Sequence, residues 1–93
     1  LELCPRGMNP REIEAALLEC LPGAHEIHDL HVWEITTGYV CLTAHVVVDD
    51  LPLSSTRELT SDAEERMREA FGIGHVTLQF ESRGTEAQAR DVG

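Results

Sequence analysis

The feature that most limits how this chain can fold is a change in hydrophobic period along its sequence. Apolar residues recur at helical spacing over 10–21, alternate singly over 27–49, return to helical spacing over 53–71, and alternate again over 75–81. A period of three to four residues indicates an amphipathic helix, and a period of two indicates a strand. Because Thr37-Gly38 is a turn signal, the predicted order is helix, strand, strand, helix, strand.

Signals at the helix ends support these boundaries. Asn9 is a predicted N-cap, Pro10 suits the first helical position, and Pro22-Gly23 ends the first helix. Gly72 ends the second helix. The two predicted apolar stripes are Ile13, Ala16, Leu17, Cys20 and Leu21 in the first helix, and Leu59, Ala63, Met67, Ala70 and Phe71 in the second.

The alternating segments predict an antiparallel hairpin followed by a third strand. One parity of these strands is apolar, and both helices must cover it, because no other segment is long enough to do so. The predicted fold class is therefore α+β, a ferredoxin-like α-β-β-α-β open-faced sandwich. The uncovered face is mixed in character and is a candidate interface. Its residues are Asp29, His31, Trp33, Ile35, Tyr39, Cys41, His45, Val47, Gln79 and Glu81.

The charge of the chain excludes two classes of partner. Seven arginines, no lysine and 17 acidic residues give a net charge of −10. Binding to phosphate groups requires a basic surface, so we expect no nucleic-acid partner and no attraction to an anionic membrane. The same negative potential favours divalent cations.

The cysteines and the other reactive side chains do not indicate an enzyme. Cys4, Cys20 and Cys41 are odd in number and lack CxxC spacing, which predicts free thiols in a reducing compartment. Cys41 and His45 share a strand parity but would lie ~13 Å apart, too far for a nucleophile and its base. No glycine-rich phosphate loop is present. We therefore expect no catalytic activity.

Histidine is the residue type that points to a specific chemistry. Four of the five histidines lie on or beside the predicted strands, together with Asp29 and Glu81. Imidazole nitrogens and carboxylate oxygens are ligands that Zn²⁺ accepts in proteins. Their spacing is not a compact zinc motif, and a single histidine in a strand is more often structural. The residues alone therefore leave open both metal binding and incidental histidines, at His25, His28, His31, His45 and His75.

Three segments in this order resemble the C-terminal cytoplasmic domain of the cation diffusion facilitator family. They are HDLHVW at 28–33, LTAHV at 42–46 and HVTLQFE at 75–81. The resemblance extends from about Leu3 through Ser82 and is nearest to the bacterial zinc-efflux branch. It implies a metallochaperone-like fold, and it implies that the parent protein is a homodimeric antiporter that exports Zn²⁺ or related ions from the cytoplasm in exchange for protons.

The resemblance also implies a set of metal ligands. By position these are His28, His45 and Glu81, and His75 and Gln79 are further candidates because the third-strand ligand varies within the family. The implied cofactor is Zn²⁺ or another divalent transition metal. Strict alternation, however, places His28 on the core side of the sheet, opposite to the other two main ligands. An irregular strand start at His28 would resolve this conflict.

The organisation of the parent protein follows from the same resemblance. Residues 1–8 are expected to be the linker from a missing membrane domain, 9–82 the metal-binding dimerisation domain, and 83–93 a flexible tail. The implied partners are a second copy, docked through the open sheet face, and a covalently attached transmembrane domain. The full-length protein would lie in the bacterial inner membrane with this domain on its cytoplasmic side, whereas the fragment itself is expected to be soluble.

The expected function is to sense cytosolic metal by binding it and dimerising. Two alternatives remain open at this point. In the first alternative, the chain is a free-standing cytosolic metal chaperone or buffer. In the second, it is a pure dimerisation module whose histidines are incidental.

Overall fold

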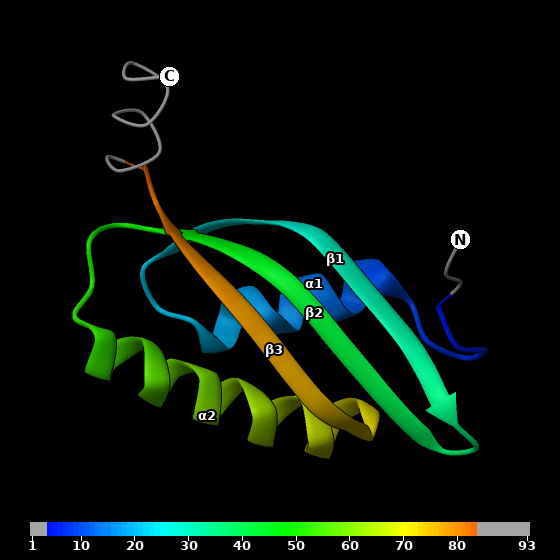
Figure 1. Ribbon diagram of the computed structural model, residues 1–93. Coiled ribbons are helices and arrows are strands. Elements are labelled where there is room, and N and C mark those ends of the chain that lie inside the picture. The colour runs from blue at the N-terminus through cyan, green and yellow to red at the C-terminus, as the bar shows by residue number, and fades with distance from the viewer. Residues whose placement is uncertain (1–3, 84–93) are drawn as a thin grey trace.

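The computed structural model describes residues 4–83, and the elements follow the predicted order. Both helices lie on one side of the sheet (Figure 1), so the α-β-β-α-β open-faced sandwich is confirmed. Within the described residues, neither helix is long and apolar enough to cross a membrane. The elements are α1 (Pro10–Cys20), β1 (Ala24–Thr36), β2 (Tyr39–Val48), α2 (Leu53–Phe71) and β3 (Ile73–Ser82).

The sheet is mixed, with the strand order β1-β2-β3. β1 and β2 form the predicted antiparallel hairpin, and Gly38 in its turn has φ +84°. β3 lies parallel to β2 on the other side. A parallel neighbour requires a long crossover connection, which α2 provides. The expected tail lies outside the described residues from position 84 onward, as do the first three residues of the expected linker.

The helix ends confirm the signals read from the sequence. The Asn9 side chain accepts a hydrogen bond of 2.9 Å from the backbone N–H of Arg11, and Pro10 opens α1. α2 ends at Gly72, which has φ +70° and donates its N–H to the carbonyl of Arg68 at 2.9 Å. Glycine suits this position because side chains disfavour positive φ.

The core fills the space between the sheet and the two helices. The α2 stripe runs through Ala63, Met67 and Phe71 at intervals of four residues. The prediction that Ala70 belongs to this stripe is wrong: its helical spacing from Ala63 and Met67 fits the stripe, but the residue is exposed. The largest fully buried side chains are Ile13, Leu17, Leu21, Leu42, Val46, Met67 and Ile73.

β1 starts three residues earlier than predicted and contains an internal bulge. His28 pairs with His45, and the next pair of the ladder begins at His31. The two residues between them, Asp29 and Leu30, face a single residue of β2. Asp29 has φ +54°, in the left-handed region that residues other than glycine seldom adopt. A bulge of this kind shifts the alternation of side chains by one residue.

The bulge decides which β1 side chains face the helices. Before it, Ile27 packs in the core; after it, Leu30 and Val32 do. His28 and His31 therefore both lie on the open face. Strict alternation is wrong for His28, and the cause is an extra residue inside the strand rather than an irregular start.

Candidate metal centre

The three strands bring His28, His45 and Glu81 into contact on the open face. Nε2 of His28 lies 3.1 Å from Oε1 of Glu81, and Nδ1 of His45 lies 2.6 Å from Oε2 of the same carboxylate. The two imidazole rings are 5.2 Å apart, centroid to centroid. His28 and Glu81 are 53 positions apart in sequence, so only the completed sheet brings them together.

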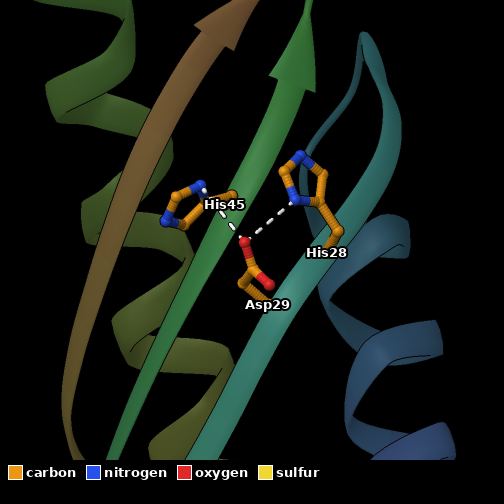
Figure 2. A group of neighbouring side chains, drawn as sticks. All are labelled: His28, Asp29 and His45. Atoms are coloured by element: carbon orange, nitrogen blue, oxygen red, sulfur yellow. Dashed lines mark hydrogen bonds and ion pairs between the residues drawn. The ribbon is translucent and has the colours of Figure 1, made fainter.

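Asp29 is a second carboxylate at the same place. Its Oδ2 atom lies 3.3 Å from Nδ1 of His28 and 3.8 Å from Nδ1 of His45 (Figure 2). Each of these three residues offers one ligand atom, and the three atoms lie within 4.8 Å of one another. The sequence predicts Asp29 on this face beside the histidines, but it was not among the predicted ligands. Its close contact with His28 depends on the bulge.

The donor set fits a divalent transition metal. Bonds of about 2.0–2.2 Å around a tetrahedral ion place neighbouring ligand atoms roughly 3.3–3.6 Å apart. The nitrogen–oxygen separations in this cluster range from 2.6 to 3.8 Å. The side chains are partly exposed, so small rotations can adjust these distances. Imidazole and carboxylate suit Zn²⁺ and are also accepted by Co²⁺, Ni²⁺ and Cu²⁺.

The carboxylates already attract positive charge to this point. Burial acts to lower the pKa of His28, but its hydrogen bonds to Asp29 and Glu81, together with their negative charges, outweigh that effect and raise the pKa. The Glu81 side chain is 21% exposed and that of His28 is 40% exposed. A cluster that favours a proton on imidazole in this way also favours a cation.

The remaining two predicted ligands lie in different places. Gln79 pairs with His45 in the sheet register, and both line a shallow pocket of about 410 Å³. His75 pairs with Cys41 near the start of β3, and its Nε2 atom lies 3.1 Å from the hydroxyl of Thr77. The structure therefore places Gln79 at the edge of the cluster and His75 outside it.

The far end of the open face is apolar and aromatic. Ile35 is 60% exposed and Tyr39 is 45% exposed, while Trp33 is half-buried opposite Cys41. Cys41 itself is buried, because it is a small side chain in the middle strand between Trp33 and His75. An apolar surface thus lies on the same uncovered face as the histidine cluster.

A larger pocket of about 520 Å³ lies between β3 and the start of α2. Its apolar lining includes Leu51, Leu53, Leu78 and Phe80, and none of the five predicted ligands contributes to it. Size therefore does not identify the candidate site. The candidate site is identified instead by its cluster of nitrogen and oxygen donors.

Comparison with known sequences connects this geometry to a protein family. Residues 5–83 match the family model described as cation efflux protein, cytoplasmic domain. The metal cation efflux system protein CzcD of Cupriavidus metallidurans is 37% identical over 81 residues, which are 87% of this chain and 25% of that protein. The cadmium, cobalt and zinc/H(+)-K(+) antiporter of Bacillus subtilis is 43% identical over 75 residues, 80% of this chain and 23% of that protein. The chain thus spans about a quarter of the length of these relatives.

Solved structures show the same arrangement of elements. The metal-bound C-terminal domain of the CzcD transporter from the same Cupriavidus species superposes with a TM-score of 0.66 at 36% identity, covering 80% of this chain and 99% of that chain. The zinc form of the putative zinc transporter CzrB gives a TM-score of 0.74 at 28% identity, covering 90% and 96%. The likeness extends over nearly the whole of each solved chain.

Proposed function

This chain belongs to the cation diffusion facilitator family of cation efflux proteins and corresponds to their cytoplasmic domain, and on that premise we propose that it senses a divalent metal for an efflux transporter. The observation that carries the proposal is the meeting of His28, His45 and Glu81, from three strands, on the uncovered sheet face. The relatives are named for the efflux or antiport of metal cations, zinc, cadmium and cobalt among them. Zn²⁺ is the ion we propose, because imidazole and carboxylate are ligands that it accepts and two of these relatives are named for zinc.

In this proposal Nε2 of His28, Nδ1 of His45 and the carboxylate of Glu81 hold the ion. Gln79 stands beside His45 and is near enough in the register to offer a neutral oxygen. His75 lies outside the cluster, and we expect it to contribute little to affinity. The bound cation supplies two positive charges to a face that is otherwise rich in carboxylates.

These charges are the link between metal binding and assembly. Two chains that each carry a net charge of −10 repel one another when their open faces approach. The exposed Ile35 and Tyr39 give the same face an apolar area that a second copy can cover. Cations held by both protomers would reduce the repulsion and favour a closed dimer over an open one.

A sensor of this kind needs only a modest difference in metal-binding free energy between the closed and the open dimer. Moving a population from mostly open to mostly closed requires about 5 kcal/mol of differential binding, and two sites per dimer share that requirement. In a full-length transporter, closure of the cytoplasmic domains would report to an attached membrane domain that cytosolic metal is high.

Isothermal titration calorimetry with Zn²⁺ tests the proposal. Replacement of His45 by alanine removes one ligand and should lower affinity at least about 10–100-fold, the loss usual for supporting residues of metal sites. His75→Ala is the matched control, because it removes a histidine from the same face but outside the cluster, and it should bind nearly as the wild type does. Equal isotherms for wild type and His45→Ala would remove His45 from the site.

The two alternatives give different results with the wild-type protein. A dimerisation module with incidental histidines would show no heat of zinc binding above that of dilution. A metal chaperone or buffer would bind zinc, but its sedimentation coefficient would not change on binding. A sensor is expected to show both the heat and a zinc-dependent increase in the dimer.

A further inference from the structure

Two neighbouring residues of β1 have side chains on the same face of the sheet. Successive side chains of a regular strand point to opposite faces, yet Nδ1 of His28 and Oδ2 of Asp29 are 3.3 Å apart. The exception occurs where Asp29 adopts φ +54° within the bulge. Aspartate and asparagine tolerate this left-handed conformation better than other residues with side chains do. The irregular backbone is thus what makes the contact between these two side chains.

The two nitrogens of His28 face different carboxylates. Nδ1 faces Asp29, whereas Nε2 faces Glu81 at 3.1 Å. A neutral imidazole carries its hydrogen on one nitrogen only, and the other nitrogen is the one that can bind a metal. If Nδ1–H donates to Asp29, Nε2 is the nitrogen available on the Glu81 side.

Two observations favour the Glu81 side for the cation. The Glu81 carboxylate also meets Nδ1 of His45, at 2.6 Å, whereas Oδ2 of Asp29 is 3.8 Å from that atom. The Glu81 side chain is 21% exposed and the Asp29 side chain 62% exposed, so solvent screens the charge of Glu81 less. A cation beside Glu81 therefore reaches donors from all three strands.

We propose that Asp29 is a positioning residue of the metal site: its carboxylate accepts the Nδ1–H of His28 and so fixes Nε2 as the nitrogen that meets the cation. The inference rests on the proposed metal-binding function and assigns the orientation of one ligand within it. Carboxylates that orient metal-bound histidines in this manner typically contribute about 10–100-fold to affinity.

Three substitutions distinguish the effect of the backbone conformation at residue 29 from the effect of its carboxylate. Asp29→Gly keeps the positive φ but removes the acceptor, so zinc affinity should fall about 10–100-fold while the melting temperature of the metal-free domain changes little. Asp29→Asn keeps both the φ preference and an acceptor oxygen, so it should recover most of that affinity. Asp29→Ala should lower both zinc affinity and the melting temperature, since alanine disfavours this backbone. Asp62→Asn, on the exposed side of α2, is the charge-matched control and should bind as the wild type does.

Long-range ¹H–¹⁵N NMR of the imidazole rings reads the orientation directly. In the zinc-bound wild type, Nδ1 of His28 should carry the hydrogen and Nε2 should show the shift of a metal-bound nitrogen. In metal-free Asp29→Gly, at alkaline pH that deprotonates the imidazolium, the preference for the Nδ1–H tautomer should be lost. A metal-bound Nδ1 in the wild type would make Asp29 a direct ligand and overturn the proposal, as would unchanged affinity in Asp29→Gly.

Failure of the proposed function would look different. If the wild type bound no zinc, metal sensing would be excluded, and with it the positioning role. If the wild type bound zinc and the three Asp29 variants bound it equally well, metal binding would stand and only the role of Asp29 would be lost.

Discussion

His28 is the residue at which a proton and a metal ion would compete in the proposed site. It faces Asp29 on its own strand, His45 on β2 and Glu81 on β3. Its pKa is raised above the ordinary value of 6.5, because the two carboxylates outweigh burial. The ring therefore stabilises the metal-free fold below about pH 6.5, and this contribution is lost as the pH rises through the raised pKa.

Zinc binding should have the opposite dependence on pH. Only unprotonated imidazole ligates, so affinity should rise as the pH increases through the pKa of His28. Binding at pH 7 should release protons, which calorimetry in buffers of different ionisation enthalpy would measure as a buffer-dependent heat. Equal zinc affinity at pH 5 and pH 7.5 would contradict ligation by His28 and His45.

At the scale of elements, the sequence predicts helices better than it predicts strands. Helical spacing and the end signals at Asn9, Pro10 and Gly72 act locally, so the ends of α1 and α2 agree with the structure to within a residue. The length of β1 depends on its partner strand, and the sequence pattern predicts a start at Ile27 whereas β1 begins at Ala24. Alternation cannot reveal how much of a strand its neighbour will pair with.

The bulge is the feature of the site that alternation missed. One signal for the bulge is present in the sequence. Ile27 and Leu30 are both apolar and lie three residues apart, and two residues at this spacing can both face the core only if the strand contains an extra residue between them. The closeness of His28 to Glu81 followed from resemblance to a family and not from spacing, because 53 residues separate them. The proximity of Asp29 could not be predicted, since it depends on one positive φ.

The end of α2 provides a test of local stability. Replacing Gly72 by alanine places a side chain at φ +70° and should destabilise the domain by about 1–2 kcal/mol. Urea unfolding followed by circular dichroism measures this change. Ser61→Ala, at an exposed position within the same helix, is the control and should be neutral or slightly stabilising. Equal urea midpoints for wild type and Gly72→Ala would show that alanine at this position does not lower the free energy of unfolding, and would contradict the prediction.

At the scale of the whole molecule, the two faces of the sheet differ in that the helices cover only one of them. The helices cover one face of the sheet, and the main cluster of buried apolar side chains lies on that side. The other face carries the histidine cluster, and the exposed Ile35 and Tyr39 lie at its far end beside the turn between β1 and β2. In the proposed function, metal binding and association would therefore share the open face, and the main core would lie on the other side of the sheet.

Because the apolar residues and the histidine cluster lie in different parts of the open face, a substitution among the apolar residues should weaken association without abolishing zinc binding. Ile35→Asp places a charge in the apolar area and should weaken the zinc-dependent dimer about 10-fold or more, while each chain still binds zinc. Leu53→Asp is the control, because Leu53 is 81% exposed but lies at the start of α2. Sedimentation equilibrium with zinc compares the variants. A dimer weakened by Leu53→Asp but not by Ile35→Asp would place the interface on the helical side.

The central claim is that three strands gather two imidazoles and a carboxylate around a divalent ion. Anomalous X-ray diffraction at the zinc edge, from crystals grown with zinc, measures this most directly. We predict an anomalous peak about 2.0–2.2 Å from Nε2 of His28, Nδ1 of His45 and a carboxylate oxygen of Glu81. Crystals grown in excess zinc that show no peak among these three side chains would contradict it.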